Sequence, residues 1–135
     1  MRSDTQTVTI EADARLVYQV LADPETLPRW AVGFCRSIRT EGGRWVAQTA
    51  QGDVGIRYAT DPTSGVIDFH ISPAPGVEVV ANSRVVANGD GAEYIFTQFQ
   101  MPGMPDHVFE ANVAALKEEL GVLRALMRAR AICPA

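Results

Sequence analysis

Polar and apolar residues alternate along much of this chain, and a helical spacing replaces the alternation near the C-terminus. Val8 and Ile10 alternate with Thr7 and Thr9. This predicts a half-buried strand, because successive side chains of a strand point to opposite faces. The chain shows no repeat, linker or low-complexity segment, so we expect a single domain over residues 1–135.

Two short helices are predicted after the first strand. Asp13 is placed to cap the first helix with its side-chain oxygen. The apolar stripe of this helix, which ends near residue 22, comprises Val17, Val20 and Leu21. Asp23 and Pro24 begin the second helix as N-cap and first helical residue, and Pro28 and Trp30 keep it short.

Residues 34–99 read as strands joined by turns. The turn signals are 41–43, 51–52, 61–65, 72–76 and 88–91. Centring each turn between its flanking strands predicts which residues lie opposite one another. The predicted pairs include Thr49 with Val54, Ala47 with Ile56, Trp45 with Tyr58, Tyr58 with Ile67, Ile56 with Phe69, Phe69 with Val79, Val85 with Tyr94, Ser83 with Phe96 and Ala81 with Gln98.

These pairs place most apolar residues on one face of the sheet. That face holds Trp45, Ala47, Thr49, Val54, Ile56, Tyr58, Ile67, Phe69, Ile71, Val77, Val79, Ala81, Ser83, Val85, Tyr94, Phe96 and Gln98. The opposite face is mostly polar and includes Gln48, Arg57, Asp68, His70, Glu78, Asn82, Arg84, Glu93 and Thr97, together with Val46, Val80, Val86 and Ile95. An antiparallel sheet with one solvated side has this pattern.

The last helix supplies the apolar surface that covers the sheet. Its stripe, at four-then-three spacing, is Phe109, Val113, Leu116, Leu120, Leu123 and Met127. A helix over residues 106–130 would be roughly 37 Å long, enough to cross a whole sheet. The fold class is therefore α+β, with a curved antiparallel sheet that grips one long C-terminal helix.

Composition excludes several function classes. The net charge is -4, with eleven Arg, one Lys and no basic cluster, which argues against nucleic acid and anionic membrane as partners. The N-terminus lacks the apolar segment of a signal peptide, and no apolar run is long enough to span a bilayer, so we expect a cytoplasmic protein. Cys35 and Cys133 are expected to be free thiols, and we expect no metal and no cofactor.

Three segments resemble a known family. They are Val8-x-Ile10-x-Ala12-x-Ala14 through Asp23-Pro24-Glu25 to Trp30; Arg84-Val85-Val86-x-Asn88-Gly89-x-Gly91; and Phe99-Gln100-x-Pro102-Gly103-Met104 leading to Phe109-Glu110. They are similar to the START/Bet v 1-like (SRPBCC) superfamily, in its polyketide cyclase/dehydrase branch. The resemblance implies the helix-grip fold, with seven strands around the C-terminal helix and a cavity for an apolar molecule. The sequence departs from the family pattern at two positions. Pro105 stands where a Ser cap is usual, which leaves Asp106 as the expected cap, and Gln98 stands where an apolar residue is usual.

The candidate ligand site combines residues of the apolar face with two aromatics after the second helix. The predicted ligand-binding residues are Trp30, Phe34, Trp45, Thr49, Tyr58, Phe69, Ser83, Tyr94, Phe96, Gln98 and Val113. Small side chains at Ala47, Ala81 and Ser83 favour a hollow. The polar members either orient a ligand or form hydrogen bonds with the backbone, with one another or with water. The aromatic members either belong to the core or form a wall on which a planar ligand stacks.

Other groups leave alternatives open. If Phe34 and Ile38 both face inward, Arg36 does too and requires an anionic partner; a bulge or slipped register would place it in solvent. The cluster of Arg57, Asp68, His70 and Glu78 falls on the polar face, with Arg57 opposite Asp68 and His70 opposite Glu78. This cluster would become an active site only if the two faces were inverted. Met101, Met104 and Pro105 are candidates for a lip of the pocket, and His107 with Glu110 is too small a set for a metal site.

The sequence therefore predicts a protein that binds an apolar or aromatic small molecule, lipid- or polyketide-like, between the sheet and the last helix. The alternatives are a polyketide cyclase or dehydratase in which Tyr58, Tyr94 or Gln98 polarises a carbonyl, and a co-chaperone-like interaction module. No catalytic residue is assigned. A homodimer is compatible with the sequence.

Overall fold

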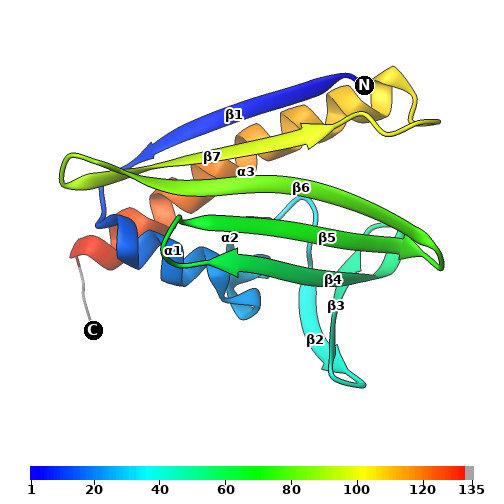
Figure 1. Cartoon of the computed structure of the whole chain (residues 1–135), viewed down its shortest axis with the longest axis horizontal. Helices are drawn as coiled ribbons and strands as arrows, with labels where there is room; N and C mark the ends of the chain where they lie inside the picture. The colour runs from blue at the N-terminus through cyan, green and yellow to red at the C-terminus, as the bar shows by residue number, and fades with distance from the viewer. Residues whose placement is uncertain (133–135) are drawn as a thin grey trace.

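The computed structural model describes residues 1–132 and contains one seven-stranded antiparallel sheet with the order β1-β7-β6-β5-β4-β3-β2. The strands are β1 Ser3–Ile10, β2 Ser37–Glu41, β3 Arg44–Thr49, β4 Gly52–Asp61, β5 Val66–Ala74, β6 Val77–Asn88 and β7 Gly91–Phe99. Every neighbouring pair from β2 to β7 is joined by a hairpin, and β1 closes the order by pairing with β7. The sheet curls, so that β2 and β3 lie well away from β1 (Figure 1).

The helices are α1 Ala14–Ala22, a 3-10 turn η1 Pro24–Thr26, α2 Leu27–Trp30 and α3 Asp106–Ile132. Both predicted caps are confirmed. Asp13 Oδ1 accepts a hydrogen bond from the Arg15 backbone N–H at 2.8 Å, and Asp23 Oδ1 accepts one from Glu25 at 3.0 Å. These side chains satisfy N–H groups that have no partner within the first helical turn.

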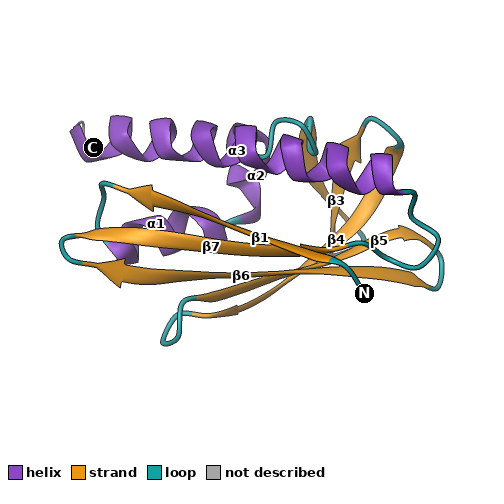
Figure 2. Cartoon of the chain, turned by 90° about the horizontal axis from the view of Figure 1, so that it is seen from above, coloured by secondary structure: helices purple, strands orange, loops and turns teal. Residues whose placement is uncertain are grey.

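Helix α3 runs along the concave side of the sheet and ends near α1 and α2 (Figure 2). The expected cap is wrong, because Asp106 is itself helical and its carboxylate accepts a hydrogen bond from Gln100 Nε2 at 2.7 Å. Pro105 instead provides the first helical carbonyl, which accepts hydrogen bonds from Val108 and Phe109. The fold is the helix-grip fold, as the sequence predicted.

The predicted faces largely agree with the structure, although the predicted register is wrong in three of the four hairpins with predicted pairs and right only between β6 and β7. Val85 does pair with Tyr94. However, Trp45 lies opposite Ile56 rather than Tyr58, Tyr58 lies opposite Phe69, and Phe69 lies opposite Ala81. The other predicted pairs across the β3–β4, β4–β5 and β5–β6 hairpins shift in the same way. For example, Ala47 lies opposite Val54, and Ile56 lies opposite Ile71. Because each shift is two residues, the side chains keep their predicted faces. The exception is Val77, which was predicted to face the core; it follows a bulge in the β5–β6 pairing and is 48% exposed.

The charged cluster lies on the convex face of the sheet. Arg57 is opposite His70 and Asp68 is opposite Ala59, so the two expected charge pairs do not face each other directly. His70 Nδ1 still lies 2.9 Å from Glu78 Oε1, on the diagonal across β5 and β6. This contact lowers the pKa of Glu78, and the cluster has the features of a cross-strand pair at the surface.

Candidate functional site

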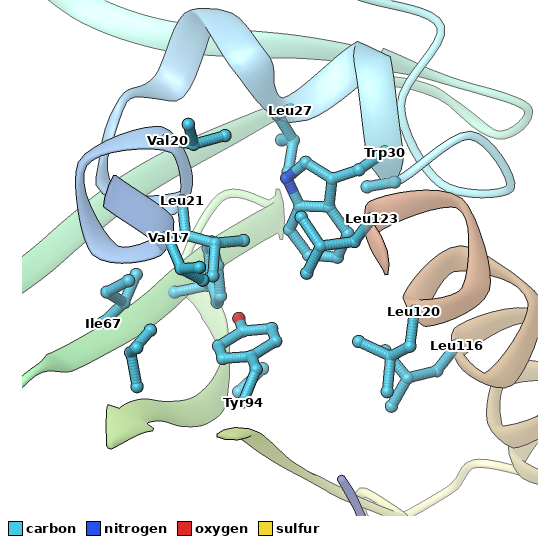
Figure 3. Close-up of a cluster of buried hydrophobic side chains, with 14 of the residues drawn as sticks. Val17, Val20, Leu21, Leu27, Trp30, Ile67, Tyr94, Leu116, Leu120 and Leu123 are labelled. Carbon is cyan, nitrogen blue, oxygen red and sulfur yellow. The ribbon is translucent and has the colours of Figure 1, made fainter. Parts of the chain in front are cut away.

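The concave face has a densely packed region that we call the closed end. It comprises Val17, Leu21, Trp30, Ile67, Tyr94, Leu120 and Leu123, none of which is more than 3% exposed. Helices α1 and α2 lie at the end of the sheet where β6 ends and β7 begins (Figure 1). In Figure 3 the Trp30 ring fills the space between the α1 side chains and the leucines of α3. Three helices and the sheet therefore share one apolar core here.

A second region of the same face keeps accessible surface, and we call it the open end. It comprises Ile71, Val79, Phe96, Gln98 and Val113, all half-buried. These residues come from the later parts of β5 and β7, the start of β6 and the first half of α3. They lie toward the end of the sheet opposite to α1. Gln98 of this end reaches the backbone of α3, and the five side chains stay only partly buried.

A continuous row of aromatic rings connects the two ends. Ring centroids lie 6.2 Å apart for Trp30–Tyr94, 6.1 Å for Tyr94–Phe96, 5.8 Å for Phe96–Phe69 and 5.0 Å for Phe69–Tyr58. All but the Phe96–Phe69 pair, which is stacked, are edge-to-face. The row passes from fully buried rings to the half-buried Phe96 and Tyr58. Five of the predicted site residues are thus in mutual contact.

Four predicted polar site residues find partners within the protein. Thr49 Oγ1 donates to Gly52 O at 2.7 Å, within the turn after β3. The Tyr94 hydroxyl donates to Ser83 Oγ at 2.9 Å, and Ser83 in turn donates to a backbone carbonyl of β5. Gln98 Nε2 reaches Asn112 O of α3 at 3.4 Å. These four positions are satisfied without a ligand.

Tyr58 differs from the other polar residues of this face. Its hydroxyl oxygen is buried and has no hydrogen-bond partner, a property that among the described residues it shares with Trp30 Nε1. Burial, followed by the nearby groups of Tyr94, Cys35 and Asp23, raises the pKa of Tyr58 far above its ordinary value. The hydroxyl therefore stays protonated at neutral pH and can act as a donor.

Trp45 and Phe34 lie on the margins of the site. Trp45 lines an open pocket of about 470 Å³ between the β2–β3 hairpin and the η1–α2 segment, together with Pro28 and Ile38. Phe34 is half-buried and packs against the core from the segment between α2 and β2. Trp45 thus lines a hollow to which neither Phe96 nor Val113 contributes.

The inward orientation considered for Arg36 is wrong. Arg36 is exposed, and the neighbouring buried position is taken by Cys35, which is 1% exposed. The chain turns after α2, with the N–H groups of Phe34 and Cys35 both bonded to Ala31 O, and β2 starts only at Ser37. Because of this turn, the alternation of side chains between the two faces of a strand does not run from Phe34 to Arg36. The inward direction of Phe34 therefore does not determine the direction of Arg36.

The sequence analysis missed one buried acid. Glu119 of α3 is 7% exposed, and its Oε2 accepts hydrogen bonds from the N–H groups of Gly33 at 3.2 Å and Phe34 at 3.1 Å. Burial raises its pKa to about 7, and the two hydrogen bonds oppose that rise. The available signal was its spacing, three residues after Leu116 and four before Leu123, which places it on the apolar stripe.

The remaining candidates lie away from the concave face or are not described. Met101 and Met104 are half-buried in the turn before α3, whereas His107 and Glu110 are exposed on its first turns. Among residues 1–132, no three His, Cys, Asp or Glu side chains come close enough together to hold a metal ion. In the same range, no helix combines the length and apolar composition needed to cross a membrane. Cys133 lies outside the described residues.

Solved structures share this architecture at low sequence identity. XoxI from Bacillus cereus is 16% identical over 94% of this chain and 96% of its own, with a TM-score of 0.75. Ara h 8.0201 is 13% identical over 95% of this chain and 98% of its own, with a TM-score of 0.67. The di-domain ARO/CYC protein BexL is 20% identical over 93% of this chain and 46% of its own, with a TM-score of 0.72. These similarities support the helix-grip fold.

Family assignment rests on a match over almost the whole chain. No curated protein sequence matches this one. The family model described as "polyketide cyclase / dehydrase and lipid transport" matches residues 1–128, which include every strand and most of α3. The match agrees with the resemblance seen in the sequence, and it supports a role in binding or cyclising a small molecule. The chain therefore belongs to the polyketide cyclase / dehydrase and lipid transport family.

Proposed function

We propose that this protein binds an apolar, aromatic small molecule between the open end of the sheet and the first half of α3. The observation that carries the proposal is the Tyr58 hydroxyl, which is buried at the end of the aromatic row and has no hydrogen-bond partner among the described residues. A buried donor without an acceptor costs about 1–3 kcal/mol. A ligand that offers an acceptor oxygen would remove this cost.

The shape of the site favours a flat ligand. Phe96 and Tyr58 keep accessible ring surface, and rings of this kind attract planar molecules by stacking and edge contacts. Ala81, between Phe69 on β5 and the end of β7, contributes only a methyl group to the floor of the site. On the opposite wall, Val113 of α3 is also small and half-buried. Apolar walls with one polar anchor are typical of small-molecule sites.

The biosynthetic setting of BexL supports the same ligand class. BexL is named as a di-domain ARO/CYC of the BE-7585A biosynthetic pathway. We extend to this chain the idea of a ligand from such a pathway, with fused or conjugated rings and carbonyl oxygens. The Tyr58 hydroxyl would donate to one of these oxygens. It would orient the ligand in a carrier and would also polarise the carbonyl in a cyclase, which is the second candidate function.

A native mass spectrum of the purified protein tests the binding function first. A co-purified small molecule would support it, a stoichiometric protein partner would favour an interaction module, and turnover of an offered polyketide would favour the cyclase.

Binding is then measured by fluorescence with N-phenyl-1-naphthylamine, an uncharged aromatic probe. Val113→Trp should weaken it at least tenfold by filling the open end. Val108→Trp, an exposed position on the same helix, should leave it unchanged. Equal affinities in the two variants would overturn the proposal.

The role of the hydroxyl is tested with a matched pair of probes. We expect 2-acetylnaphthalene to bind about fivefold more tightly than 2-ethylnaphthalene, because one hydrogen bond contributes about 1 kcal/mol. Tyr58→Phe should abolish this preference and leave the affinity for the ethyl compound intact. Tyr18→Phe, a tyrosine of α1 that lines another pocket, should retain the preference. A preference that survives in Tyr58→Phe would show that the anchor lies elsewhere.

A further inference from the structure

The strongest feature outside the proposed ligand contacts is a bridge between α3 and the segment that joins α2 to β2. Glu119 Oε2 accepts both the Gly33 N–H and the Phe34 N–H. The Phe34 N–H is shared with Ala31 O, whereas the Gly33 N–H has Glu119 as its one partner among the described residues. One carboxylate therefore fixes the middle of this segment to the helix.

The segment and the helix are in direct contact at this bridge. A Cβ added to Gly33 would lie 3.5 Å from Ala115 Cβ and 3.6 Å from Glu119 Oε2, which is ordinary van der Waals distance. Glu119 is 7% exposed, whereas Val32 and Gly33 are exposed. Residues 32–34 thus lie between the carboxylate and the solvent. Movement of this segment away from α3 would hydrate the carboxylate.

The surroundings of Glu119 contain few charges that could compensate a buried anion. On the facing segment, the titratable group near Glu119 is the thiol of Cys35; burial and, to a smaller extent, Glu119 raise the pKa of this thiol, so that it is neutral near pH 7. On α3, Lys117 and Glu118 are exposed. The two N–H groups are the direct partners of the carboxylate, and they do not offset its burial, which raises the pKa to about 7.

We propose that Glu119 is a pH-dependent latch: its neutral form holds residues 33–34 against α3, and its ionisation favours release of this segment together with Phe34. Phe34 is one of the predicted ligand-binding residues. Release would therefore open one side of the site. Glu119 acts through this segment and is a positioning residue. The consequence for the ligand rests on the proposed function, but the latch itself does not.

The sign follows from proton linkage. The pKa of the Glu119 carboxyl is about 7 when the segment covers it, and it returns to its ordinary value near 4.5 when water reaches it. The carboxyl therefore binds its proton more tightly in the covered state. Protonation therefore favours the covered state, and opening becomes easier as pH rises through 7. With full hydration on opening, the opening equilibrium should increase about tenfold between pH 6 and pH 8.

Amide hydrogen exchange measured by NMR tests the latch. The protection factors of Gly33 and Phe34, which are corrected for the intrinsic effect of pH on exchange, should fall about tenfold from pH 6 to pH 8. Glu119→Gln keeps an acceptor oxygen but cannot ionise, so its protection factors should not change. Glu118→Gln removes the adjacent exposed carboxylate and should behave like the wild type. Flat protection in the wild type, or an unchanged fall in Glu119→Gln, would overturn the proposal.

A second readout separates the latch from the ligand. The dissociation rate of N-phenyl-1-naphthylamine, followed by stopped flow, should rise with pH in the wild type and in Glu118→Gln but not in Glu119→Gln. If the probe does not bind at any pH while the amide protection still falls, the proposed function fails and the latch stands. If the probe binds and the protection is flat, the latch fails and the function stands.

Discussion

The two ends of the concave face are built from similar residues and differ in what covers them. At the closed end, Leu123 of α3 and Tyr94 of β7 are fully buried where α1, α2 and α3 meet the sheet. At the open end, Ile71 and Phe96 project from the same face of the same sheet but stay only partly buried. Apolar composition does not separate the two ends. The position of the short helices α1 and α2 does.

This difference divides stability from function. Side chains that lose all contact with water contribute most to folding, and half-buried ones contribute less. The closed end therefore holds the fold together. The open end keeps part of its apolar surface accessible, and in the proposed function a ligand covers this surface. The predictions below test that division, first at fixed pH in order of decreasing effect and then as a function of pH.

Truncation of a leucine at the closed end should have the largest effect. Leu123→Ala removes a side chain with no exposure, and a cavity of this kind costs about 3 kcal/mol. Ile71→Ala, the matched truncation at the open end, should cost about 1 kcal/mol because the side chain is already half exposed. Urea unfolding measures both free energies. Equal costs would remove the distinction between the ends.

Removal of the hydroxyl should affect the free energy of unfolding differently at Tyr94 and at Tyr58. Tyr94→Phe breaks the hydrogen bond to Ser83 inside the core and should cost about 1 kcal/mol. Tyr58→Phe removes a hydroxyl without a partner and should leave stability unchanged or raise it by about 0.5 kcal/mol. Thermal unfolding of both variants gives the comparison. A clear loss of stability in Tyr58→Phe would show that its hydroxyl is satisfied in the free protein.

A pH-dependent effect concerns Glu119, which joins α3 to the segment after α2. Because its pKa is raised to about 7 in the folded protein, its contribution to stability is present below about pH 4.5 and is lost as pH rises through 7. The difference in unfolding free energy between Glu119→Gln and the wild type should therefore grow in favour of the variant from pH 5 to pH 8. A difference that does not change with pH would mean that the Glu119 carboxyl is hydrated in the folded protein.

The sequence was sufficient for the fold and for the two faces of the sheet. Face assignment needs only the parity of the alternation, and a register error of two residues leaves parity intact. The register itself depends on turn length: Thr49 pairs with Gly52, so the turn after β3 is two residues shorter than the centred turn that placed Thr49 opposite Val54. Spacing alone does not give that length.

The site was less predictable because its main features arise from tertiary packing. Trp30 and Phe96 are both aromatics on the core side, and nothing in their local sequence shows that one lies under helices and the other does not. Glu119 was missed because the apolar stripe of α3 was traced through hydrophobic residues alone. A charged residue at the spacing of an apolar stripe is the sequence pattern that indicates a buried acid.

Xenon binding observed by methyl NMR compares the two ends without any knowledge of the ligand. Xenon under pressure enters accessible apolar cavities and shifts the signals of the methyl groups that line them. We expect shifts at Ile71, Val79 and Val113 of the open end, with Ile67, Leu120 and Leu123 of the closed end unchanged. Shifts confined to the closed end, or none at the open end, would contradict the distinction between the two ends.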